Sequence, residues 1–375
     1  MKKVRLGIIG IGLMGIRHVN NIMEGKVPEI ELVAVADIKQ TARTWAAEYL
    51  GADFPICQDS NELYNRSDLD AVLIAVPHYQ HPTLTTEALK KGLHVLCEKP
   101  AGVYTKHVRE MNEIAAKSGK VFALMYNQRT NNYYKKMHEL VTGGSLGAIT
   151  RTSWIVTDWF RSEAYYASGE WRGTWDGEGG GVLLNQCPHN FDLFQWICGM
   201  PSRVRAFCHN GKWHNIEVED DVTAYFEYPN GATGTFITTT GEAPGTNRFE
   251  ISLEKGKLVI NNSNELFLHR LNTSYMEFSK TTKGFFDKPE CTIEKLEVDN
   301  DYPDHSGVMR AFAGRILRGE PLIAEGHEGI NGLTLSNAIH LSSWLDKTIE
   351  IPFDEDLFLA ELNKRRATSK YKSES

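Results

Sequence analysis

The feature that most constrains this chain is a glycine-rich turn between an apolar run and a helical pattern near its start. Gly10, Gly12 and Gly15 form a G-x-G-x-x-G pattern that follows the run Val4–Ile9 and opens the pattern Leu13–Met23. In a strand–turn–helix unit the first glycine allows the tight turn, the second lets backbone approach a pyrophosphate, and the third permits close packing of helix on strand. The free N–H groups at the start of such a helix bind anions. The pattern predicts a dinucleotide site, although glycines in this spacing also occur in plain turns.

The next apolar run ends at Asp37, at about the distance from the glycines at which an acidic residue meets the adenosine ribose. A carboxylate accepts hydrogen bonds from a free 2′-hydroxyl but repels a 2′-phosphate. Lys39, two residues on, weakens this preference. We therefore expect NAD as the cofactor, with NADP less favoured.

Residues 1–125 alternate short apolar runs with longer helical patterns, which is the sequence form of βαβ units and a parallel sheet. The runs are nearly continuous in Val, Ile, Leu and Ala, as expected for strands covered on both faces. The expected strands are Val4–Ile9, Glu31–Ala36, Ala71–Ala75, His94–Cys97 and Val121–Leu124. The expected helices are Leu13–Met23, Gln40–Leu50, Pro82–Lys91 and Lys106–Lys117. This predicts an α/β Rossmann dinucleotide-binding domain over residues 1–125.

After a helix expected at Asn132–Val141, alternating runs appear that are joined by turns too short for crossover helices. The expected strands are Ile149–Thr157, Arg203–His209, Val222–Tyr228, Thr233–Thr240, Phe249–Leu253 and Leu258–Ile260, and the late helices are Ser306–Leu317 and His327–Leu345. We expect residues 126–362 to form an α+β domain, an open and mainly antiparallel sheet with helices on one face, for substrate binding and oligomer contacts. The polar tail, residues 363–375, is expected to fray.

Composition limits the class of partner. A chain of 375 residues favours two domains. Its 41 Lys and Arg against 48 Asp and Glu argue against nucleic acid or an anionic membrane as the main partner, which leaves small molecules. The six cysteines are scattered without a C-x-x-C pair, which fits a reducing cytoplasm. No apolar stretch approaches the ~18 residues that a membrane span needs.

Two further motifs carry a family resemblance. Glu98-Lys99-Pro100 directly follows the run His94–Cys97, and Gly179-Gly180-Gly181 leads to His189 and Asp192. With the N-terminal glycines, these motifs resemble the glucose–fructose oxidoreductase, inositol dehydrogenase and MocA (Gfo/Idh/MocA) family over roughly residues 1–350. The resemblance implies a Rossmann domain, a larger open-sheet domain and a Lys/His active site.

The resemblance assigns a role to each of two catalytic residues. Lys99 matches the family lysine that contacts nicotinamide ribose and substrate, and an ammonium there favours an alkoxide-like transition state. His189 matches the proton acceptor, because an imidazole titrates near neutrality. The alternatives are a solvated surface lysine and a core histidine.

Asn185 stands where the family usually has an aspartate, four residues before His189, and Cys187 stands where a glycine is common. Asn185 can still hydrogen-bond a substrate hydroxyl, so it is a candidate catalytic and substrate-binding residue. Because Pro188 requires a helix to begin close by, Asn185 is alternatively a helix N-cap. Asp192 either orients His189 or stabilises the helix N-terminus.

The remaining cofactor residues come from the ends of the expected parallel strands, where the family lines the nicotinamide side. We assign cofactor binding to Gly10, Ile11, Gly12, Leu13, Met14, Asp37, Val76, Pro77, His78, His81, Glu98, Lys99, Gln128 and Arg172. His78 and His81 form a His-x-x-His pair, but no carboxylate or cysteine stands at ligand spacing, so no metal is expected.

Seven aromatic residues crowd into residues 154–175, against 10% aromatic in the chain as a whole. They are Trp154, Trp159, Phe160, Tyr165, Tyr166, Trp171 and Trp175. Flat apolar rings stack on the C–H faces of pyranoses, so we expect them to line the substrate cleft, with packing or oligomer contact as the alternative. We assign substrate binding to Lys99, Tyr126, Asp158, Trp159, Trp171, Arg172, Asn185 and His189.

These expectations lead to an NAD-dependent dehydrogenase acting on a secondary hydroxyl of a sugar, of a glycoside, with C3 as a candidate position, or of an inositol. The family also allows a glycosidase that oxidises transiently and then eliminates the aglycone. A non-catalytic nucleotide-binding sensor is the third alternative. By analogy with the family, we expect a homodimer or homotetramer.

Overall fold

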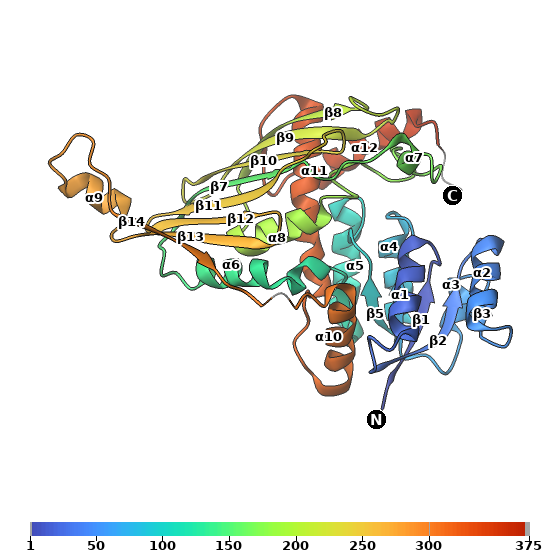
Figure 1. The fold of residues 1–375 in the computed structure, drawn as a ribbon. Coiled ribbons are helices and arrows are strands. Elements are labelled where there is room, and N and C mark those ends of the chain that lie inside the picture. Colours follow the sequence, from blue (N-terminus) through green and yellow to red (C-terminus); the bar gives the residue numbers. More distant parts are fainter. Residues whose placement is uncertain (1, 300, 372–375) are drawn as a thin grey trace. The chain divides into compact units, whose positions relative to one another are not determined.

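The computed structural model describes residues 2–299 and 301–371. Contacts divide the chain into two compact units (Figure 1). Unit 1 comprises Met1–Thr130 and Tyr302–Leu333, and unit 2 comprises Asn131–Asp301 and Thr334–Ser375. The boundary expected after residue 125 thus has a counterpart at residue 130. The return of residues 302–333 to the first unit had no counterpart among the expectations.

Unit 1 is built on a parallel sheet of six strands among the described residues, in the order β3-β2-β1-β4-β5-β6. Its strands are β1 (Val4–Ile9), β2 (Ile30–Ala36), β3 (Ile56–Cys57), β4 (Ala71–Ile74), β5 (His94–Cys97) and β6 (Phe122–Leu124). This confirms the expected Rossmann fold, in which strand order reverses between β1 and β4 and ligands bind at the carboxyl ends of the strands. The sequence did not predict β3, whose two residues are too few to form a pattern.

The first five helices of unit 1 lie between successive strands of the sheet, and the others follow its last strand. They are α1 (Leu13–Met23), α2 (Gln40–Leu50), α3 (Ser60–Tyr64), α4 (Gln80–Lys90), α5 (Thr105–Ser118), the 3₁₀ helices η1 (Asn127–Thr130) and η2 (Gly326–Glu328), and α10 (Asp304–Arg318). Val308, Met309 and Phe312 of α10 are buried in one cluster with Leu6 and Ile8 of β1. Residues from the far end of the sequence therefore complete the core of unit 1.

Unit 2 contains a nine-stranded sheet within the described ranges, in the order β14-β13-β12-β11-β7-β10-β9-β8-β15. Its strands are β7 (Ile149–Val156), β8 (Arg203–Asn210), β9 (Glu219–Glu227), β10 (Thr233–Thr239), β11 (Asn247–Leu253), β12 (Gly256–Asn261), β13 (Glu265–Leu271), β14 (Cys291–Leu296) and β15 (Ile349–Glu350). Neighbouring strands run antiparallel except β7 and β10, which pair in parallel. The mainly antiparallel sheet is thus confirmed, with one parallel pair at its centre.

One face of this sheet is packed, because buried and more exposed residues alternate along β8 and β9. The helices of unit 2 are α6 (Asn132–Thr142), α7 (Glu163–Tyr166), α8 (Pro188–Cys198), α9 (Tyr275–Thr281) and α12 (Glu355–Thr368), and α11 (Gly329–Leu345) begins in unit 1 and continues here. The segment with α9 projects beyond the sheet edge at β14 (orange in Figure 1).

The structure differs from the expected frayed tail, because residues 363–368 belong to a helix. Helix α12 continues to Thr368 because Asp354 caps its first turn, accepting from the backbone N–H groups of residues 356 and 357. Phe358 and Leu362 are buried, and Arg366 donates to Asp176 at 2.7 Å. Ser369 is buried as well and donates from Oγ to Glu217 at 2.6 Å. Residues 372–375 of the expected tail lie outside the described residues. In the described chain, no helix is both long and apolar enough to span a bilayer.

Candidate functional site

The glycine turn between β1 and α1 has two positions that require glycine and one that is open. Gly10 has φ +92°, and a Cβ there would lie 2.3 Å from the carbonyl oxygen of Ala75. A Cβ on Gly15 would lie 1.9 Å from the carbonyl oxygen of Gly10. Around a Cβ on Gly12, by contrast, no heavy atom of the described residues comes within 4 Å. The turn therefore leaves space above the start of α1, where a pyrophosphate fits.

The start of α1 also has the electrostatic character that an anion requires. Among the described residues, no side chain caps Gly12 at the N-cap and no acidic residue lies in the first turn. Asp37, directly after β2, accepts from the Ile11 amide and from the Lys39 amide, each at 2.7 Å. The predicted acidic residue thus lies against the glycine turn, and Leu13 is 78% exposed beside it. These residues fit the adenosine and pyrophosphate parts of NAD.

His81 joins the segments that follow β4 and β5. Its Nδ1 lies 2.6 Å from the carbonyl oxygen of Pro100, and its Nε2 lies 2.8 Å from that of Val76. The ring is buried, and burial lowers the pKa of His81 while the two carbonyls raise it. His78 is buried as well, whereas Pro77 is exposed. His81 therefore contacts the cofactor-binding segments through their backbone.

Glu98 is anchored to helix α1 by a residue that the sequence analysis did not select. His18 Nε2 lies 2.7 Å from Glu98 Oε1, and both side chains are buried. Burial raises the pKa of Glu98, but the His18 bond and neighbouring cationic groups lower it to about 2. Lys99, which is partly buried, donates its backbone N–H to Glu98 Oε2 at 3.2 Å. The position of His18, three residues after Gly15 on the dinucleotide helix, was the available sequence signal.

The last predicted residues of unit 1 follow β6. Tyr126 is buried, and the Arg129 guanidinium lies 5.9 Å from its ring centroid. Gln128 is partly exposed in η1. Of these two predicted residues, Gln128 has the side chain that reaches solvent.

In unit 2, His189 lies in the first turn of α8 and is 9% exposed. The N-cap of this helix is Cys187 and Pro188 occupies the first turn, so the N-cap alternative for Asn185 is wrong. Asn185 instead donates from Nδ2 to Oε1 of Glu178. Proline fixes the start of the helix, which leaves Asn185 in the turn before it.

The glycine run before α8 rests on a buried carboxylate. Glu219 accepts from the Gly181 amide at 2.8 Å and from the Leu183 amide at 3.0 Å. Its other oxygen lies 2.9 Å from Nε2 of His340, and both side chains are fully buried. A Cβ on Gly181 would lie 2.0 Å from the carbonyl oxygen of Glu219, so close approach of two backbones requires glycine here. Glu219 and His340 were missed because their partners are distant in sequence. Glu178 was missed because no local pattern indicates its contact with Asn185, seven residues on.

The aromatic segment divides into core and surface residues. Trp154 is fully buried and stacks on Phe249 with 4.2 Å between ring centroids, because β7 points it into the packed face of the sheet. Trp175 is buried as well, with its ring 5.6 Å from that of Trp344. The expectation that all seven rings line a substrate cleft is therefore wrong for these two tryptophans.

The partly exposed rings gather around Arg172. Its guanidinium lies 4.5 Å from the ring centroids of both Tyr165 and Trp171, and it donates to the Tyr165 hydroxyl at 2.8 Å. Arg172 also lines a cavity of about 650 Å³ together with residues such as Glu170 and Glu217. Arg172 and Trp171, both predicted site residues, are thus brought together.

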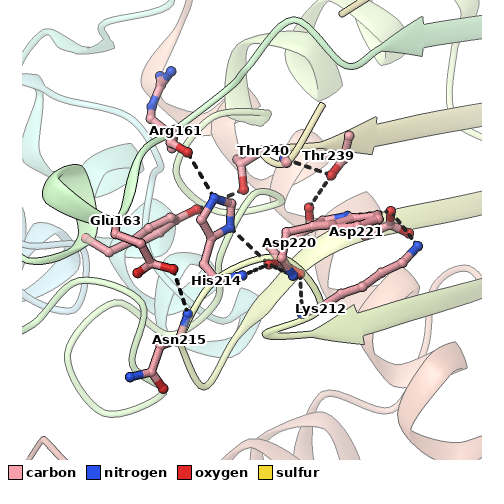
Figure 2. A network of polar contacts seen from close by, with 12 residues as sticks. Arg161, Glu163, Lys212, His214, Asn215, Asp220, Asp221, Thr239 and Thr240 are labelled. Carbon is pink, nitrogen blue, oxygen red and sulfur yellow. Dashed lines mark hydrogen bonds and ion pairs between the residues drawn. The ribbon is translucent and has the colours of Figure 1, made fainter. Parts of the chain in front are cut away.

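The predicted residues Asp158 and Trp159 lie on the loop after β7. Asp158 accepts from Asn247 Nδ2 at 3.1 Å, and burial raises the pKa of its carboxyl. Trp159 Nε1 donates to Asn190 Oδ1, on α8, at 3.3 Å. The loop is held further along by His214, whose Nε2 lies 2.9 Å from the carbonyl oxygen of Arg161 (Figure 2).

His214 is in turn fixed by Asp220, as Figure 2 shows. Asp220 is fully buried and accepts from the amides of Lys212, Trp213 and His214 at 2.8–3.0 Å. The His214 Nδ1 lies 3.0 Å from the same carboxylate. Across residues 2–299 and 301–371, no group of three or more His, Cys, Asp or Glu side chains is arranged to hold a metal ion.

Two family models match the chain. Residues 4–126 match the oxidoreductase family with an NAD-binding Rossmann fold, and residues 134–259 match the Gfo/Idh/MocA C-terminal domain. Unit 1 therefore contains an NAD-binding Rossmann domain.

Several curated proteins are similar in sequence. Rhizopine catabolism protein MocA of Rhizobium meliloti is 29% identical over 55% of this chain and 61% of its own length. Myo-inositol 2-dehydrogenase of Thermotoga maritima is 24% identical over 74% of this chain and 86% of its own length. D-glucoside 3-dehydrogenase of Escherichia coli is 28% identical over 54% of this chain and 61% of its own length. The chain thus spans between about three fifths and nearly nine tenths of these relatives.

A solved structure shares the whole architecture. The WlbA dehydrogenase from Chromobacterium violaceum, in complex with NADH and UDP-GlcNAcA, is 25% identical, has a TM-score of 0.78, and is matched over 94% of this chain and 97% of its own. Together, the two matched family models cover more than half of the sequence. The chain belongs to the Gfo/Idh/MocA family of NAD-binding oxidoreductases.

Proposed function

We propose that this protein oxidises a secondary hydroxyl of a sugar, a glycoside or an inositol. When bound, NAD accepts the hydride from the carbinol carbon, and the substrate becomes a ketone. His189 takes the hydroxyl proton, and Lys99 stabilises the negative charge that develops on the oxygen. Asn185 hydrogen-bonds the substrate.

The observation that carries the proposal is the buried bond between His18 and Glu98. His18 belongs to α1, the helix that begins at the dinucleotide turn, and Glu98 immediately precedes Lys99. The bond therefore ties the lysine segment to the helix that receives the pyrophosphate. A lysine fixed in this way is suited to act on a hydroxyl beside the nicotinamide.

The names of relatives support the substrate class. Similar proteins include a myo-inositol 2-dehydrogenase and a D-glucoside 3-dehydrogenase. The partly exposed rings of Trp159 and Trp171, and the guanidinium of Arg172, offer stacking and hydrogen bonds to a pyranoside. Among substrates, we favour glycosides oxidised at C3.

The test is NADH fluorescence with a panel of pyranosides, glycosides and inositols, using NAD and NADP in parallel. We expect Lys99→Ala and His189→Asn to lower kcat by about 100- to 10,000-fold while NADH still binds. The matched controls are Lys117→Ala and His209→Asn, two exposed positions. A panel without NADH formation, together with unchanged behaviour of Lys99→Ala, would contradict the proposal.

Product analysis separates the alternatives that begin with the same oxidation. A stable keto product with stoichiometric NADH supports the dehydrogenase. Release of the aglycone without net NADH supports transient oxidation followed by elimination. Binding of NAD without turnover of any sugar supports a sensor.

We also propose a homodimer or homotetramer. Phe207 on β8, Tyr225 on β9 and Ile293 on β14 are 53%, 42% and 66% exposed on the sheet of unit 2. Light scattering of the purified protein measures its mass, and a monomer at micromolar concentration contradicts this.

A further inference from the structure

A buried carboxyl group lies at the start of the glycine run that leads to His189. Glu178 is 2% exposed. Its Oε2 accepts from the Gly173 amide at 2.6 Å, and its Oε1 accepts from Nδ2 of Asn185. Glu178 therefore contacts the residue that stands, in place of the usual aspartate, four positions before His189.

Backbone hydrogen bonds hold the segment that joins Asn185 to the start of α8. The Asn185 amide donates to the Gly181 carbonyl and the Cys187 amide to the Val182 carbonyl, each at 2.9 Å. Cys187 is the N-cap of α8, whose first turn holds His189. A change at the Asn185 side chain thus takes place at the end of the helix that presents the histidine.

The charges around Glu178 leave both of its protonation states accessible near neutrality. Burial, together with the smaller effect of the Glu219 charge, raises the pKa of the Glu178 carboxyl to about 7. The bonds from Asn185 and Gly173 and the charge of Arg172 act in the opposite direction.

The charged and titratable neighbours have partners of their own. Glu219 is paired with His340 at 2.9 Å, and Arg172 donates to the Tyr165 hydroxyl at 2.8 Å. The phenols of Tyr165 and Tyr166 also interact with the Glu178 charge, but burial raises their pKa values still further above neutrality. Within this group, the pKa of the Glu178 carboxyl is thus raised to about 7.

The two forms of a carboxyl group hold a primary amide in opposite orientations. An ionised carboxylate only accepts, so it binds Nδ2 of Asn185 and leaves Oδ1 at the other end of the amide. A protonated carboxyl donates from Oε1 and binds Oδ1, which turns Nδ2 outward. In both forms Oε2 still accepts from Gly173, so the exchange requires only rotation of the Asn185 amide.

We propose that Glu178 is a positioning residue whose proton decides whether Asn185 presents an acceptor or a donor to the substrate. The inference rests on the proposed function of Asn185 and His189. An outward Oδ1 accepts a hydrogen bond from the hydroxyl of the alcohol, whereas an outward Nδ2 donates to the oxygen of the ketone. The ionised form binds the alcohol, and the protonated form binds the ketone.

The variant Glu178→Gln imitates the protonated form. Its Oε1 still accepts from Gly173, so its Nε2 faces Asn185 and holds Oδ1. We expect the KM for the alcohol to rise by about two- to tenfold, the value of one lost hydrogen bond between neutral groups. Inhibition by the ketone product should be unchanged or tighter.

The dependence on pH separates this role from a merely structural one. In the wild type, the KM for the alcohol should rise as pH falls through about 7, because Glu178 gains a proton. In Glu178→Gln the part of this dependence that arises at residue 178 should disappear, whereas a part that arises from His189, the proposed proton acceptor, should remain. Glu163→Gln is the control, because Glu163 is an exposed carboxylate of the same unit, and its pH profile should match the wild type.

A second readout does not depend on turnover. The side-chain amide resonances of Asn185, assigned by their loss in Asn185→Ala, should shift between about pH 6 and about pH 8 in wild-type holoenzyme and stay constant in Glu178→Gln. Resonances that are constant in the wild type, or that titrate equally in both proteins, overturn the proposal. So does an unchanged KM for the alcohol in a Glu178→Gln protein that binds NADH normally.

The two proposals fail in different ways. If no sugar or polyol is oxidised, the proposed function fails, and the titration of the Asn185 amide still decides whether Glu178 orients it. If oxidation is found but the amide does not respond to pH, the dehydrogenase stands and the role of Glu178 is refuted.

Discussion

His18 and Glu98, eighty residues apart in the sequence, share a buried hydrogen bond of 2.7 Å. The bond keeps a carboxylate ionised where burial alone would neutralise it, since the pKa of Glu98 is lowered to about 2. A group whose pKa is lower in the folded state stabilises the fold above its unfolded pKa. That stabilisation is lost as pH falls through the folded pKa.

We therefore predict that Glu98→Gln lowers the free energy of unfolding at pH 7 by on the order of 3 kcal/mol. The difference between the wild type and the variant should narrow as pH falls from about 4.5 to about 2. Urea denaturation at a series of pH values measures it. Glu113→Gln, an exposed carboxylate of unit 1, should show a small difference at every pH. A difference in unfolding free energy between the wild type and Glu98→Gln that stays constant with pH would falsify this account.

Alanine substitutions at two glycines of the dinucleotide turn should affect NAD binding and stability separately. A methyl group at Gly12 meets no described heavy atom within 4 Å, so Gly12→Ala should fold normally. It should bind NAD about tenfold or more weakly, because the methyl occupies the space for the pyrophosphate. Calorimetric titration with NAD and thermal unfolding give the two values.

Gly15→Ala should behave in the opposite way. Its Cβ would lie 1.9 Å from the carbonyl oxygen of Gly10, so helix and turn must move apart. We expect a loss of about 1–3 kcal/mol in unfolding free energy, the usual cost of overpacking. Equal stability of the two alanine variants would show that the close packing of α1 has been misjudged.

Asp37 should set the choice of dinucleotide. Its carboxylate lies against the Ile11 amide at 2.7 Å, where a 2′-phosphate would meet a like charge. Asp37→Ser should lower the preference for NAD over NADP by roughly 10- to 100-fold in kcat/KM. Asp53→Asn, an exposed aspartate of the same unit, should leave the preference unchanged.

Substitution of Asp220 should lower the stability of unit 2 more than most other substitutions there. It accepts from three backbone amides and lies 3.0 Å from Nδ1 of His214. Asp220→Ala leaves buried donors without acceptors, so we expect a loss of about 3–5 kcal/mol. The neighbouring Asp221 pairs with Lys212 nearer the surface. Changing Asp221 to Asn should lower the free energy of unfolding by about 1 kcal/mol or less. Denaturant midpoints of the two variants decide between these expectations.

Local patterns were sufficient to predict most of the Rossmann unit. The runs Val4–Ile9 and His94–Cys97 match β1 and β5 residue for residue, because strands covered on both faces are continuously apolar. The edge strand β14, with nearly every residue exposed, has no buried face to produce a pattern. The parallel pairing of β7 with β10 joins segments about 80 residues apart, and no local signal encodes it.

The candidate site was predictable where a motif carries the chemistry. Asp37 and the glycines lie where the spacing placed them. The long-range contact of His18 with Glu98 depends on the folded chain, and so does the contact of Glu178 with Asn185, which is only seven residues on. Trp154 was misread because alternation along β7, and not the local abundance of aromatic residues, decides which way its ring points.

The return of α10 to unit 1 has a consequence for biosynthesis. Met309 and Phe312 fill a cluster whose other members include Leu6 and Ile8. A nascent chain that has left the ribosome as far as Thr130 therefore has its six parallel strands but lacks part of the interior they enclose. The dinucleotide unit cannot finish folding until α10 has been translated as well, and no single cut releases it intact.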